Sequence, residues 1–444
     1  MATEIVVYMV VHQPRRLKLP AQPVPCGASS DDIIHCVFDE AMNERYFRYV
    51  AERCYYPAAE TFLRLARNGM KLSIGFSLSW VYQAEQWDRS LLALFQELIA
   101  EPNVELIGVE PYHSFLFLFD LPLFVQRMRW MREELTRIFG KRPRVTDTTE
   151  MCMSACLYDA IAEAGFEAGM LDGRGWVMEW REPTHLYHYD GAPRLFCRHL
   201  DLSDDVGYRF SNRTWSGFPL YAEQYADWLR HTWGDFVFIG WDFETFGEHH
   251  RYHSGIFDFI QHLPHELHQR GASFLTPGEA LDHFGAQAYQ LPLPIFPTTW
   301  AGSGGMDFFL GNSAQQAIFQ LMLATFGVAS LTEDPKLLDL ALWMAQSDNL
   351  HLIQWFGRSG SQAEVSAYFT PREWWDLGPE RIIVEQQNVY RNVIRAMERH
   401  LPAQRTHDTL ALPAATIALR SRGAKRLATQ PAPHERELLG IERY

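Results

Sequence analysis

Residues 235–250 read DFVFIGWDFETFGEHH, an apolar run followed at once by acids that alternate with aromatic residues. A short apolar run bounded by polar residues is typical of a strand that is buried on both faces, as in a parallel sheet. Asp242 and Glu244 would then follow the carboxyl end of that strand. The stretch therefore predicts a buried parallel strand that carries functional acids at its end.

Five further β-rich runs occur earlier in the chain, at residues 4–11, 72–78, 104–108, 145–148 and 168–171. Helical patterns lie between and after them, at 45–68, 84–100, 121–139, 155–164, 221–232 and 257–269. This alternation builds a parallel sheet or barrel, so we predict an α/β fold. Residues 182–216 are polar and lack a clear period, and we expect a long loop there, close to a substrate.

The pattern changes near residue 290. Three prolines fall between Leu291 and Pro297, and from residue 307 to about 399 the sequence is helical without a convincing strand. We therefore predict a barrel domain at 1–290 and a helical bundle at 291–402. Residues 403–444 contain many basic residues and little apolar period, which indicates an extended or partly disordered tail.

The charge balance argues against several classes of partner. The chain has 444 residues, with 40 basic and 54 acidic side chains and a net charge of −14, which does not suit general binding to nucleic acid or anionic membranes. Neither a signal peptide nor a run of about 18 continuous apolar residues is present. We expect a cytoplasmic protein with no membrane partner, and no motif indicates its oligomeric state.

Polar groups that a core would not accept follow several predicted strands. In an α/β barrel such groups meet at the carboxyl-terminal mouth. They include His12 after the first strand, Glu110 and His113 after the third, Glu150 after the fourth, and Asp242. Each could instead cap a helix or join an ion pair. Together they predict one site in which Glu150 and Asp242 form a carboxylate pair for acid and nucleophile chemistry.

Aromatic residues make up 14% of the chain, and their rings suit the apolar faces of sugars as well as a protein core. Trp241 and Trp300 are the better candidates for a cleft. His249 and His253 have the i, i+4 spacing of two metal ligands on one helix, but the HExxH pattern is absent, so we predict no metal.

At this point the sequence resembles glycoside hydrolase family 57, the family of α-amylases and 4-α-glucanotransferases, over most of the chain. The resemblance is carried by five ordered motifs: residues 12–14 (HQP), 108–114 (GVEPYHS), 148–150 (TTE), 242–249 (DFETFGEH) and 345–348 (AQSD).

The resemblance implies a distorted (β/α)7 barrel followed by a helical bundle that leans over the cleft. It also implies a retaining mechanism with no metal or other cofactor, with Glu150 as nucleophile and Asp242 as acid/base. By the same motifs, the groups that hold the sugar would be His12, Glu110, Glu244 and Asp348, and we add His113, His249, Trp241 and Trp300 as substrate-binding candidates.

The first functional hypothesis is therefore a retaining hydrolase of α-1,4-glucans such as maltodextrin, amylose and glycogen-type oligosaccharides. One alternative is a 4-α-glucanotransferase on the same substrates, since loops and acceptor subsites decide between water and a second sugar. Another is a glucan-binding protein that has lost turnover. A third is a metal-dependent carbohydrate deacetylase, which would also use acids and histidines at strand ends.

Overall fold

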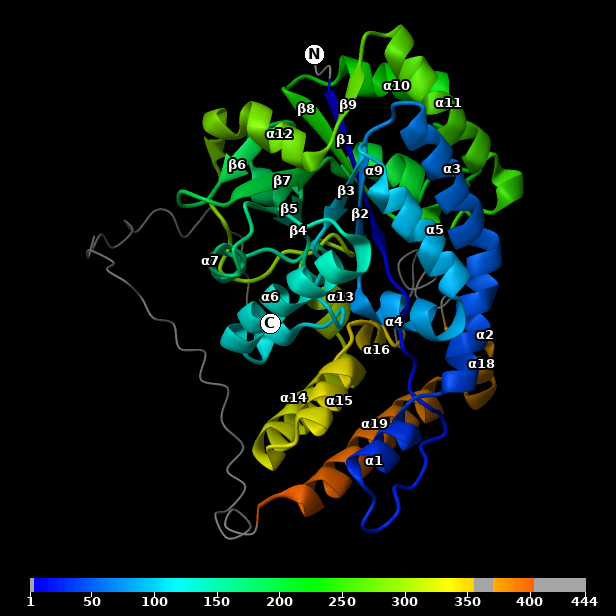
Figure 1. Ribbon diagram of the computed structural model, residues 1–444, viewed down its shortest axis with the longest axis vertical. Coiled ribbons are helices and arrows are strands. Elements are labelled where there is room, and N and C mark those ends of the chain that lie inside the picture. Colours follow the sequence, from blue (N-terminus) through cyan, green and yellow to red (C-terminus); the bar gives the residue numbers. More distant parts are fainter. Residues whose placement is uncertain (1–3, 355–369, 403–444) are drawn as a thin grey trace, which may run out of the picture. The chain divides into compact units, whose positions relative to one another are not determined.

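A computed structural model describes residues 4–354 and 370–402, and a curled sheet of parallel strands forms its centre (Figure 1). β1 (Glu4–Val11) pairs with β2 (Leu72–Phe76) on one side and β8 (Phe236–Asp242) on the other. β2 pairs with β3 (Val104–Ile107). β4 (Val145–Thr146) pairs with β5 (Ala168–Asp172), which in turn pairs with β7 (Arg194–Arg198).

Short contacts join these two groups of strands into a closed barrel. Between β3 and β4, the backbone N–H of Gly108 donates to the Val145 carbonyl at 2.9 Å. Between β7 and β8, the N–H of His199 donates to the Phe238 carbonyl at 2.8 Å. The barrel order is therefore β1, β2, β3, β4, β5, β7 and β8, which confirms the predicted (β/α)7 fold.

The sequence of β1 explains why it forms the centre. All but the first of its residues are buried, because both faces of the strand meet apolar groups. Val6, Tyr8 and Val10 pack inside the barrel, while Ile5 and Val7 pack in the larger cluster with the surrounding helices. The two-residue period of a strand thus divides one continuous apolar run between two cores.

The helices that follow the strands are set by local capping signals. For α6 (Leu121–Phe139), the Asp120 carboxylate accepts from the Leu123 N–H, and Gly140 ends the helix at φ 75°. The predicted helix at 121–139 is therefore confirmed. The predicted helix at 84–100 is two helices, because Asp88 ends the first and caps the second.

The remaining helical elements of the barrel region are α1 (Ser30–Val37), α2 (Glu40–Val50), η1 (Ala51–Tyr55), α3 (Tyr56–Arg67), α4 (Leu78–Trp87), α5 (Arg89–Ala100), η2 (Leu116–Leu118), η3 (Thr149–Met151), α7 (Ala155–Glu163), α8 (Gly175–Met178), α9 (Leu200–Gly207), α10 (Ala222–His231), η4 (Phe243–Thr245), η5 (Tyr252–Ser254), α11 (Ile256–Gln269), α12 (Pro277–Phe284) and η6 (Gly285–Gln287). The predicted helix at 45–68 corresponds to the continuous run of α2, η1 and α3.

The prediction of a long loop at residues 182–216 is wrong. This segment contains β6 (Leu186–His188), the barrel strand β7 and α9. β6 pairs antiparallel with β7 and parallel with β10 (Tyr289–Gln290), and β9 (Ser273–Leu275) pairs with β1. The sequence signal fails because β7 ends in Arg198, whose side chain is only 3% exposed. Pairing with Asp172 and Asp204 makes that burial possible.

From residue 307 the described chain is helical, as predicted. Its elements are α13 (Asp307–Leu310), α14 (Ser313–Thr332), α15 (Pro335–Met344), α16 (Asp348–His351), α18 (Arg372–Leu377), α19 (Pro379–Met397) and η7 (Glu398–His400), and α14 packs between α15 and α19. The domain boundary near residue 290 stays a prediction. The predicted tail at 403–444 lies outside the described residues.

One helix bears on the expectation that the protein has no membrane partner, which stays a prediction. α14 (Ser313–Thr332) is long and apolar enough to cross a membrane, with a mean hydropathy of 1.2, whereas the sequence analysis found no such segment. The sequence pattern did not reveal α14 as a candidate, because the helix is apolar on average but not continuously apolar. A single helix of this kind is weak evidence for a span, since helices in soluble cores pass the same test. In this protein Ile318, Met322 and Val328 of α14 belong to the main core.

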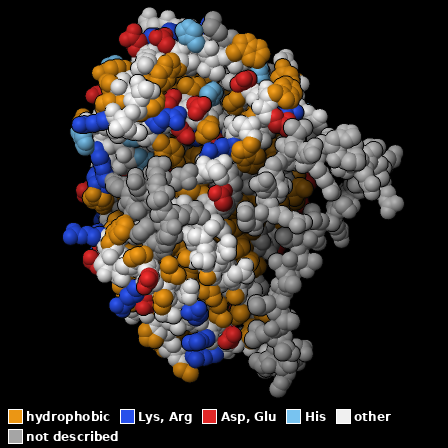
Figure 2. Space-filling view, turned by 180° about the vertical axis from the view of Figure 1, so that it is seen from behind, with side chains coloured by type: hydrophobic (Ala, Val, Ile, Leu, Met, Phe, Trp, Pro, Cys, Tyr) orange, Lys and Arg blue, Asp and Glu red, His pale blue; other side chains and the backbone are white. Residues whose placement is uncertain are grey.

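Figure 2 shows one face of the molecule, on which acidic and basic side chains lie intermixed with apolar ones. Over the described residues of this face, the net negative charge is therefore not gathered in one region. Some large apolar side chains are exposed elsewhere in the chain as single residues, such as Trp180 at 81%. Single exposed apolar residues of this kind are common in proteins.

Candidate active site

The predicted site residues come together because parallel strands end at one mouth. His12 follows β1, Asp242 ends β8, and Glu150 lies four residues beyond the end of β4. Asp348, the first residue of α16, reaches the same place from the helical part of the chain, since its Oδ2 lies 2.9 Å from Nε2 of His12. The fold thus combines residues that are 336 positions apart.

Glu150 lies in an unusual backbone conformation. It has φ 58° and ψ 32°, and Met151 after it has φ 50°. Left-handed geometry is unfavourable for a residue with a side chain and persists where the surroundings hold it. Here the Trp300 N–H and the Thr299 hydroxyl both donate to the Glu150 carbonyl oxygen, at 3.1 and 2.8 Å. The turn at Glu150 is thus held by the segment after residue 297.

The carboxylate of Glu150 is held by the same segment. Nε1 of Trp300 donates to Oε2 of Glu150 at 2.7 Å, and the Ser347 hydroxyl lies 3.4 Å from Oε1. A carboxylate aimed by an indole N–H and a fixed backbone has little freedom to turn. Glu150 is therefore oriented in the way that a nucleophile requires.

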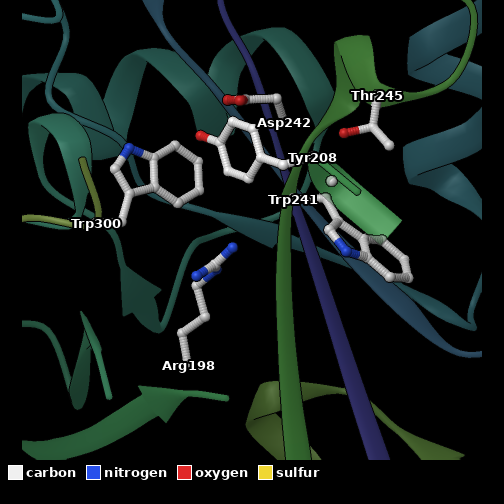
Figure 3. Close-up of a pocket in the computed structure, with 7 residues that line it drawn as sticks. Arg198, Tyr208, Trp241, Asp242, Thr245 and Trp300 are labelled. Carbon is white, nitrogen blue, oxygen red and sulfur yellow. The ribbon is translucent and has the colours of Figure 1, made fainter. Parts of the chain in front are cut away.

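Asp242 borders a small cavity that opens to solvent (Figure 3). The carboxylate lies beside the rings of Tyr208 and Trp300, which form an aromatic wall. The lining is completed by backbone or side-chain atoms of four further positions: Arg198, Gly207, Trp241 and Thr245. An apolar cavity with a few polar groups is the usual form of a small-molecule site.

Both carboxyl groups have raised pKa values. The pKa of Glu150 is raised to about 8. Burial is the largest cause, the hydrogen bond from Trp300 opposes it, and the charges of Asp242 and Asp348 add to it. Burial also raises the pKa of Asp242 to about 6, against the positive charges of Arg198 and His12. Two buried acids that repel each other titrate as a pair. Near neutral pH the higher pKa of Glu150 favours its protonated form, and the lower pKa of Asp242 favours its ionised form.

Arg198 is the buried cation of the site. Its guanidinium contacts Asp172 at 3.0 Å and Asp204 at 2.6 Å, and Nε donates to the Gly240 carbonyl at 2.9 Å. The guanidinium carbon lies 5.6 Å from the centre of the Trp300 ring. Such a cation lies within the range of a cation–π contact. Arg198 thus supports Trp300 and favours the ionised form of Asp242.

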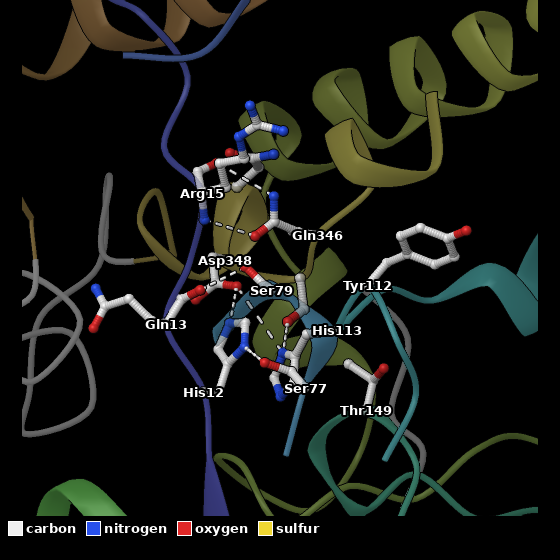
Figure 4. A network of polar contacts seen from close by, with 12 residues as sticks. His12, Gln13, Arg15, Ser77, Ser79, Tyr112, His113, Thr149, Gln346 and Asp348 are labelled. Carbon is white, nitrogen blue, oxygen red and sulfur yellow. Dashed lines mark hydrogen bonds and ion pairs between the residues drawn. The ribbon is translucent and has the colours of Figure 1, made fainter. Parts of the chain in front are cut away.

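A network of polar side chains surrounds His12 and Asp348 (Figure 4), and it reaches Glu150 through Ser347. His12 contacts Ser77 through Nδ1 at 2.8 Å and Asp348 through Nε2 at 2.9 Å. Burial raises the pKa of Asp348, but the nearby His12, His113 and His351 outweigh it and hold that pKa below its ordinary value. Asp348 is therefore ionised and fixes the orientation of His12.

His12, His113 and Asp348 together have the composition of a metal site. Ligand-type atoms of His12, His113 and Asp348 all lie within 4.8 Å of one another. However, the two imidazoles are stacked, with centres 3.8 Å apart and planes only 12° apart. An imidazole binds a metal in the plane of its ring, and one ion cannot lie in two parallel planes. The arrangement therefore favours a hydrogen-bonded cluster over a metal centre.

Glu110 and Glu244 are also close to the mouth, but they face the protein. Glu110 is fully buried and accepts from the N–H groups of Tyr112 and Ser114, at 3.0 and 2.7 Å. Glu244 accepts from the Tyr55 hydroxyl at 2.7 Å. Burial raises the pKa of each to about 8. The geometry makes Glu110 the anchor of its own loop, and its predicted contact with sugar stays a prediction.

Of the substrate-binding candidates Trp241 and His249, Trp241 borders the cavity and His249 does not, and sugar binding by either stays a prediction. Trp241 borders the cavity, but its indole is 2% exposed and donates to the Ser203 carbonyl at 2.9 Å, away from Asp242 (Figure 3). His249 does not line the cavity, and burial lowers its pKa to about 3. His249 and His253 do not share a helix, because α11 begins only at Ile256. The hypothesis of a paired metal face is therefore wrong.

The sequence analysis missed Arg198, Tyr208 and Thr245 as lining residues. The sequence signal for the first two was their place in the polar segment 182–216, and Tyr208 also lies in a stretch, residues 202–211, that resembles family 57. Arg198 lies at the carboxyl end of a barrel strand, where functional groups are expected, but that strand was not recognised.

A parallel α/β barrel whose strand ends carry two acids, one of which lines an aromatic-walled cavity, is the arrangement expected of barrel enzymes that act on carbohydrates through paired carboxylates. The comparisons give the family. The sequence pattern of glycosyl hydrolase family 57 matches residues 6–293, more than half of the chain. This protein therefore belongs to glycosyl hydrolase family 57.

A protein of Methanocaldococcus jannaschii, provisionally named an alpha-amylase, is 31% identical over 316 residues, or 70% of this chain and 66% of that protein. The 4-alpha-glucanotransferase of Thermococcus litoralis has a similar structure, with a TM-score of 0.64, 15% identity, and coverage of 90% of this chain and 60% of that one. The chain thus spans less than two thirds of the length of either relative.

The branching enzyme of Pyrococcus horikoshii is also similar, with a TM-score of 0.60, 14% identity, and coverage of 89% of this chain and 97% of the other. At identities this low, the structural likeness shows the fold alone. It agrees with the closed barrel followed by helices.

Proposed function

We propose that this protein is a retaining glycoside hydrolase that acts on α-1,4-linked glucans such as maltodextrin, amylose and glycogen-type oligosaccharides. The observation that carries the proposal is the pair of acids at the mouth, Glu150 and Asp242, beside one aromatic-walled cavity. Membership of family 57 and the names of the relatives support an α-glucan as the substrate class.

In the first step, the Glu150 carboxylate attacks the anomeric carbon and forms a covalent glycosyl-enzyme. The bond from that carbon to the leaving oxygen breaks, and Asp242 gives its proton to the oxygen. The Trp300 N–H and the left-handed turn at Glu150 support this assignment, because they aim one carboxylate oxygen and leave the other, Oε1, with only a long contact to Ser347.

In the second step, Asp242 takes a proton from water, the water oxygen attacks the anomeric carbon, and Glu150 is released. This cycle needs one proton on the pair, and the pKa values of about 8 and about 6 provide that state near neutral pH. Of the two pKa values, the higher belongs to Glu150. The proposed roles therefore require that bound sugar moves the proton from Glu150 to Asp242.

The surrounding groups suit a sugar ring. The faces of Tyr208 and Trp300 can pack against pyranose C–H groups, and His12 with Asp348 offers polar atoms to hydroxyls. We assign His113 and Glu244 the role of holding His12 and the Asp242 loop, since His113 stacks on His12 and Glu244 contacts Tyr55.

The main alternative is a 4-α-glucanotransferase, in which a second sugar takes the place of water. The chemistry of Glu150 and Asp242 would be the same, and only access to the intermediate would differ. A glucan-binding protein without turnover is the other alternative.

A product assay tests the proposal. Maltoheptaose and amylose are incubated with the wild type, Glu150→Gln and Asp242→Asn, and both chain lengths and the anomeric form of new ends are followed. Glu133→Gln serves as the control, since Glu133 is an exposed acid paired with Arg142. We expect shorter products of the α-anomer from the wild type and the control, and losses of at least about 10³-fold in the two site variants.

Each other outcome of the assay would support a different function. Longer chains that appear beside shorter ones would make the protein a transferase. Binding of amylose without any product would support the binding protein. Activity that follows a bound metal, or deacetylation of an acetylated glycan, would overturn the glucan assignment.

A further inference from the structure

We propose that Arg174 is a positioning residue for Glu150: it holds the turn at residues 299–304 in the place from which that turn orients the Glu150 backbone and carboxylate. Asp172 supports Arg174 from behind. This inference rests on the proposed function, because it concerns how that reaction's nucleophile is aimed. Arg174 touches neither Glu150 nor the cavity and is not a catalytic residue.

The first step of the argument is the anchor. Asp172 ends β5 and is fully buried. Its Oδ2 lies 2.5 Å from Nε of Arg174, and its Oδ1 lies 3.0 Å from Nη1 of Arg198. The contact with Arg174 is an ion pair without hydrogen-bond geometry, whereas the contact with Arg198 is a hydrogen bond. One carboxylate at the end of a barrel strand thus pairs with two guanidinium charges. A buried acid between two cations is a stable reference point for the loops around it.

The second step is the fork. Nη1 of Arg174 donates to the Gly302 carbonyl at 3.0 Å, and Nη2 donates to the Trp300 carbonyl. A guanidinium is planar and has donors in fixed directions, so it fixes two carbonyls relative to each other as a single ammonium cannot. Arg174 therefore sets the shape of the turn as well as its position.

The third step is the close fit of the turn around the arginine stem. Gly304 has φ 93°, and a Cβ there would lie 2.9 Å from Cγ of Arg174. The turn also closes on itself, since the Thr299 N–H donates to the Gly304 carbonyl at 2.9 Å. A glycine is thus needed for the turn to wrap the stem of Arg174.

The fourth step joins the turn to the nucleophile. The Trp300 N–H and the Thr299 hydroxyl hold the carbonyl of Glu150, and the Trp300 indole holds its carboxylate. Arg174 binds the carbonyl of that same Trp300. Arg198, the second partner of Asp172, lies over the Trp300 ring. The two cations on Asp172 thus hold the backbone and the ring of the residue that aims Glu150.

The consequence is measurable because orientation is part of the reaction barrier. Displacements of about 1 Å at a reacting group reduce rates by about 10²-fold. The Trp300 hydrogen bond also favours the ionised form of Glu150. If the turn loosens, the pKa of Glu150 rises. In the substrate complex, where the proposed roles place the proton on Asp242, the acidic limb of the pH profile of kcat then moves to higher pH.

The experiment compares Arg174→Ala, Arg174→Lys and Arg181→Ala with the wild type. Arg181 is a matched control, because its side chain is 14% exposed against 13% for Arg174 and it also donates to a backbone carbonyl, that of Gln290. Steady-state kcat and KM on maltoheptaose are measured from pH 4 to 10, with and without added guanidinium. Thermal unfolding and near-ultraviolet circular dichroism report the fold.

For Arg174→Ala we expect a fall in kcat of about 10–100-fold, with KM within about threefold of the wild type. The acidic limb should move up by at least half a pH unit. Guanidinium should restore part of kcat in Arg174→Ala and none in Arg181→Ala. Arg174→Lys should keep the defect in part, and it carries the same test if Arg174→Ala does not fold.

Unchanged kcat and pH profile in folded Arg174 variants would overturn the positioning role while leaving the proposed function intact. Equal losses in Arg181→Ala would overturn it as well, because they would show a general structural effect. A wild type that does not turn over any glucan would instead overturn the proposed function, and this inference with it.

Discussion

The indole Nε1 of Trp300 donates to Oε2 of Glu150 at 2.7 Å, across 150 positions of sequence. Glu150 follows a barrel strand, while Trp300 lies beyond the predicted domain boundary at residue 290. The nucleophile candidate is therefore aimed by a part of the chain outside the strand that carries it. The orientation of the Glu150 carboxylate therefore depends on the contact between the segment that carries Glu150 and the segment that carries Trp300.

Trp300→Phe keeps an aromatic ring and removes this donor. A hydrogen bond to a charged group contributes about 1.5–3 kcal/mol, so we expect kcat/KM on maltoheptaose to fall by about 10–150-fold. The bond lowers the pKa of Glu150, and its loss should move the acidic limb of the pH profile of kcat upward, because Glu150 is the ionised acid in the substrate complex. Trp176→Phe is the control, because Nε1 of Trp176 donates to the Ser303 carbonyl of the same turn. An acidic limb that moves equally in Trp300→Phe and Trp176→Phe would contradict the prediction.

The pair of His12 and Asp348 should behave as one unit in catalysis. His12→Gln, Asp348→Asn and the double variant form a cycle, and we expect a coupling of about 1–3 kcal/mol in kcat/KM, since contacting residues are not additive. Each single change leaves the other group without its partner. The measurement is kcat/KM for all four proteins at one pH.

The exposed pair of Lys336 and Asp31 provides the comparison. It also joins distant positions, at 2.8 Å, but its side chains are 58% and 61% exposed. Surface pairs contribute about 0–1 kcal/mol, and neither residue is near the cavity, so we expect no coupling in kcat/KM. Additive effects at His12 and Asp348 would show that the two groups act separately.

Much of the fold follows from local signals. The continuous apolar run of β1 predicted its bounds correctly, and the cap at Asp120 and the turn at Gly140 did the same for α6. β7 was missed because its two arginines resemble exposed residues. Only partners from distant segments, such as Asp172, allow Arg198 to be buried.

The candidate site divides in the same way. The positions of His12, Glu150 and Asp242 could be predicted because strand ends meet at one mouth of a barrel. The stack of His12 on His113 and the contacts that Trp300 makes with Glu150 could not, since they depend on how loops from separate segments pack. The positions of the acids could therefore be predicted from the sequence, whereas the groups that support them could be identified only in the structure.

The buried acid Glu110 should make stability depend on pH. Burial raises its pKa to about 8, above the ordinary 4.5. A raised pKa means that the folded state favours the protonated form, so this stabilisation is complete below about pH 4.5 and is lost as the pH rises through about 8. We expect the free energy of unfolding in urea to fall between pH 6 and pH 9.

Glu110→Gln, which is neutral at every pH, should flatten that decline by an amount on the order of 1–3 kcal/mol. The control is Glu133→Gln, since Glu133 is exposed and its pKa is lowered by Arg142. It should leave the slope between pH 6 and pH 9 unchanged. Equal slopes in the wild type and Glu110→Gln would show that Glu110 is ionised without cost in the folded protein.

The turn after Asp242 depends on Gly247, which has φ 117° and lies against the backbone of Arg53. A Cβ at this position would overlap the Arg53 carbonyl oxygen. Because a backbone atom cannot move aside as a flexible side chain can, we expect Gly247→Ala to lower the free energy of unfolding by about 3 kcal/mol or more, from the strain and the overlap together.

Gly255→Ala separates these two causes. Gly255 also has a positive φ, 83°, but a Cβ there would meet nothing within 4 Å. Only the left-handed backbone is then unfavourable, at about 1–2 kcal/mol. Urea unfolding of both variants at one pH measures the difference. A loss of stability at Gly247 no larger than at Gly255 would mean that the turn can move away from Arg53, and the Asp242 loop would then be less firmly held than the structure indicates.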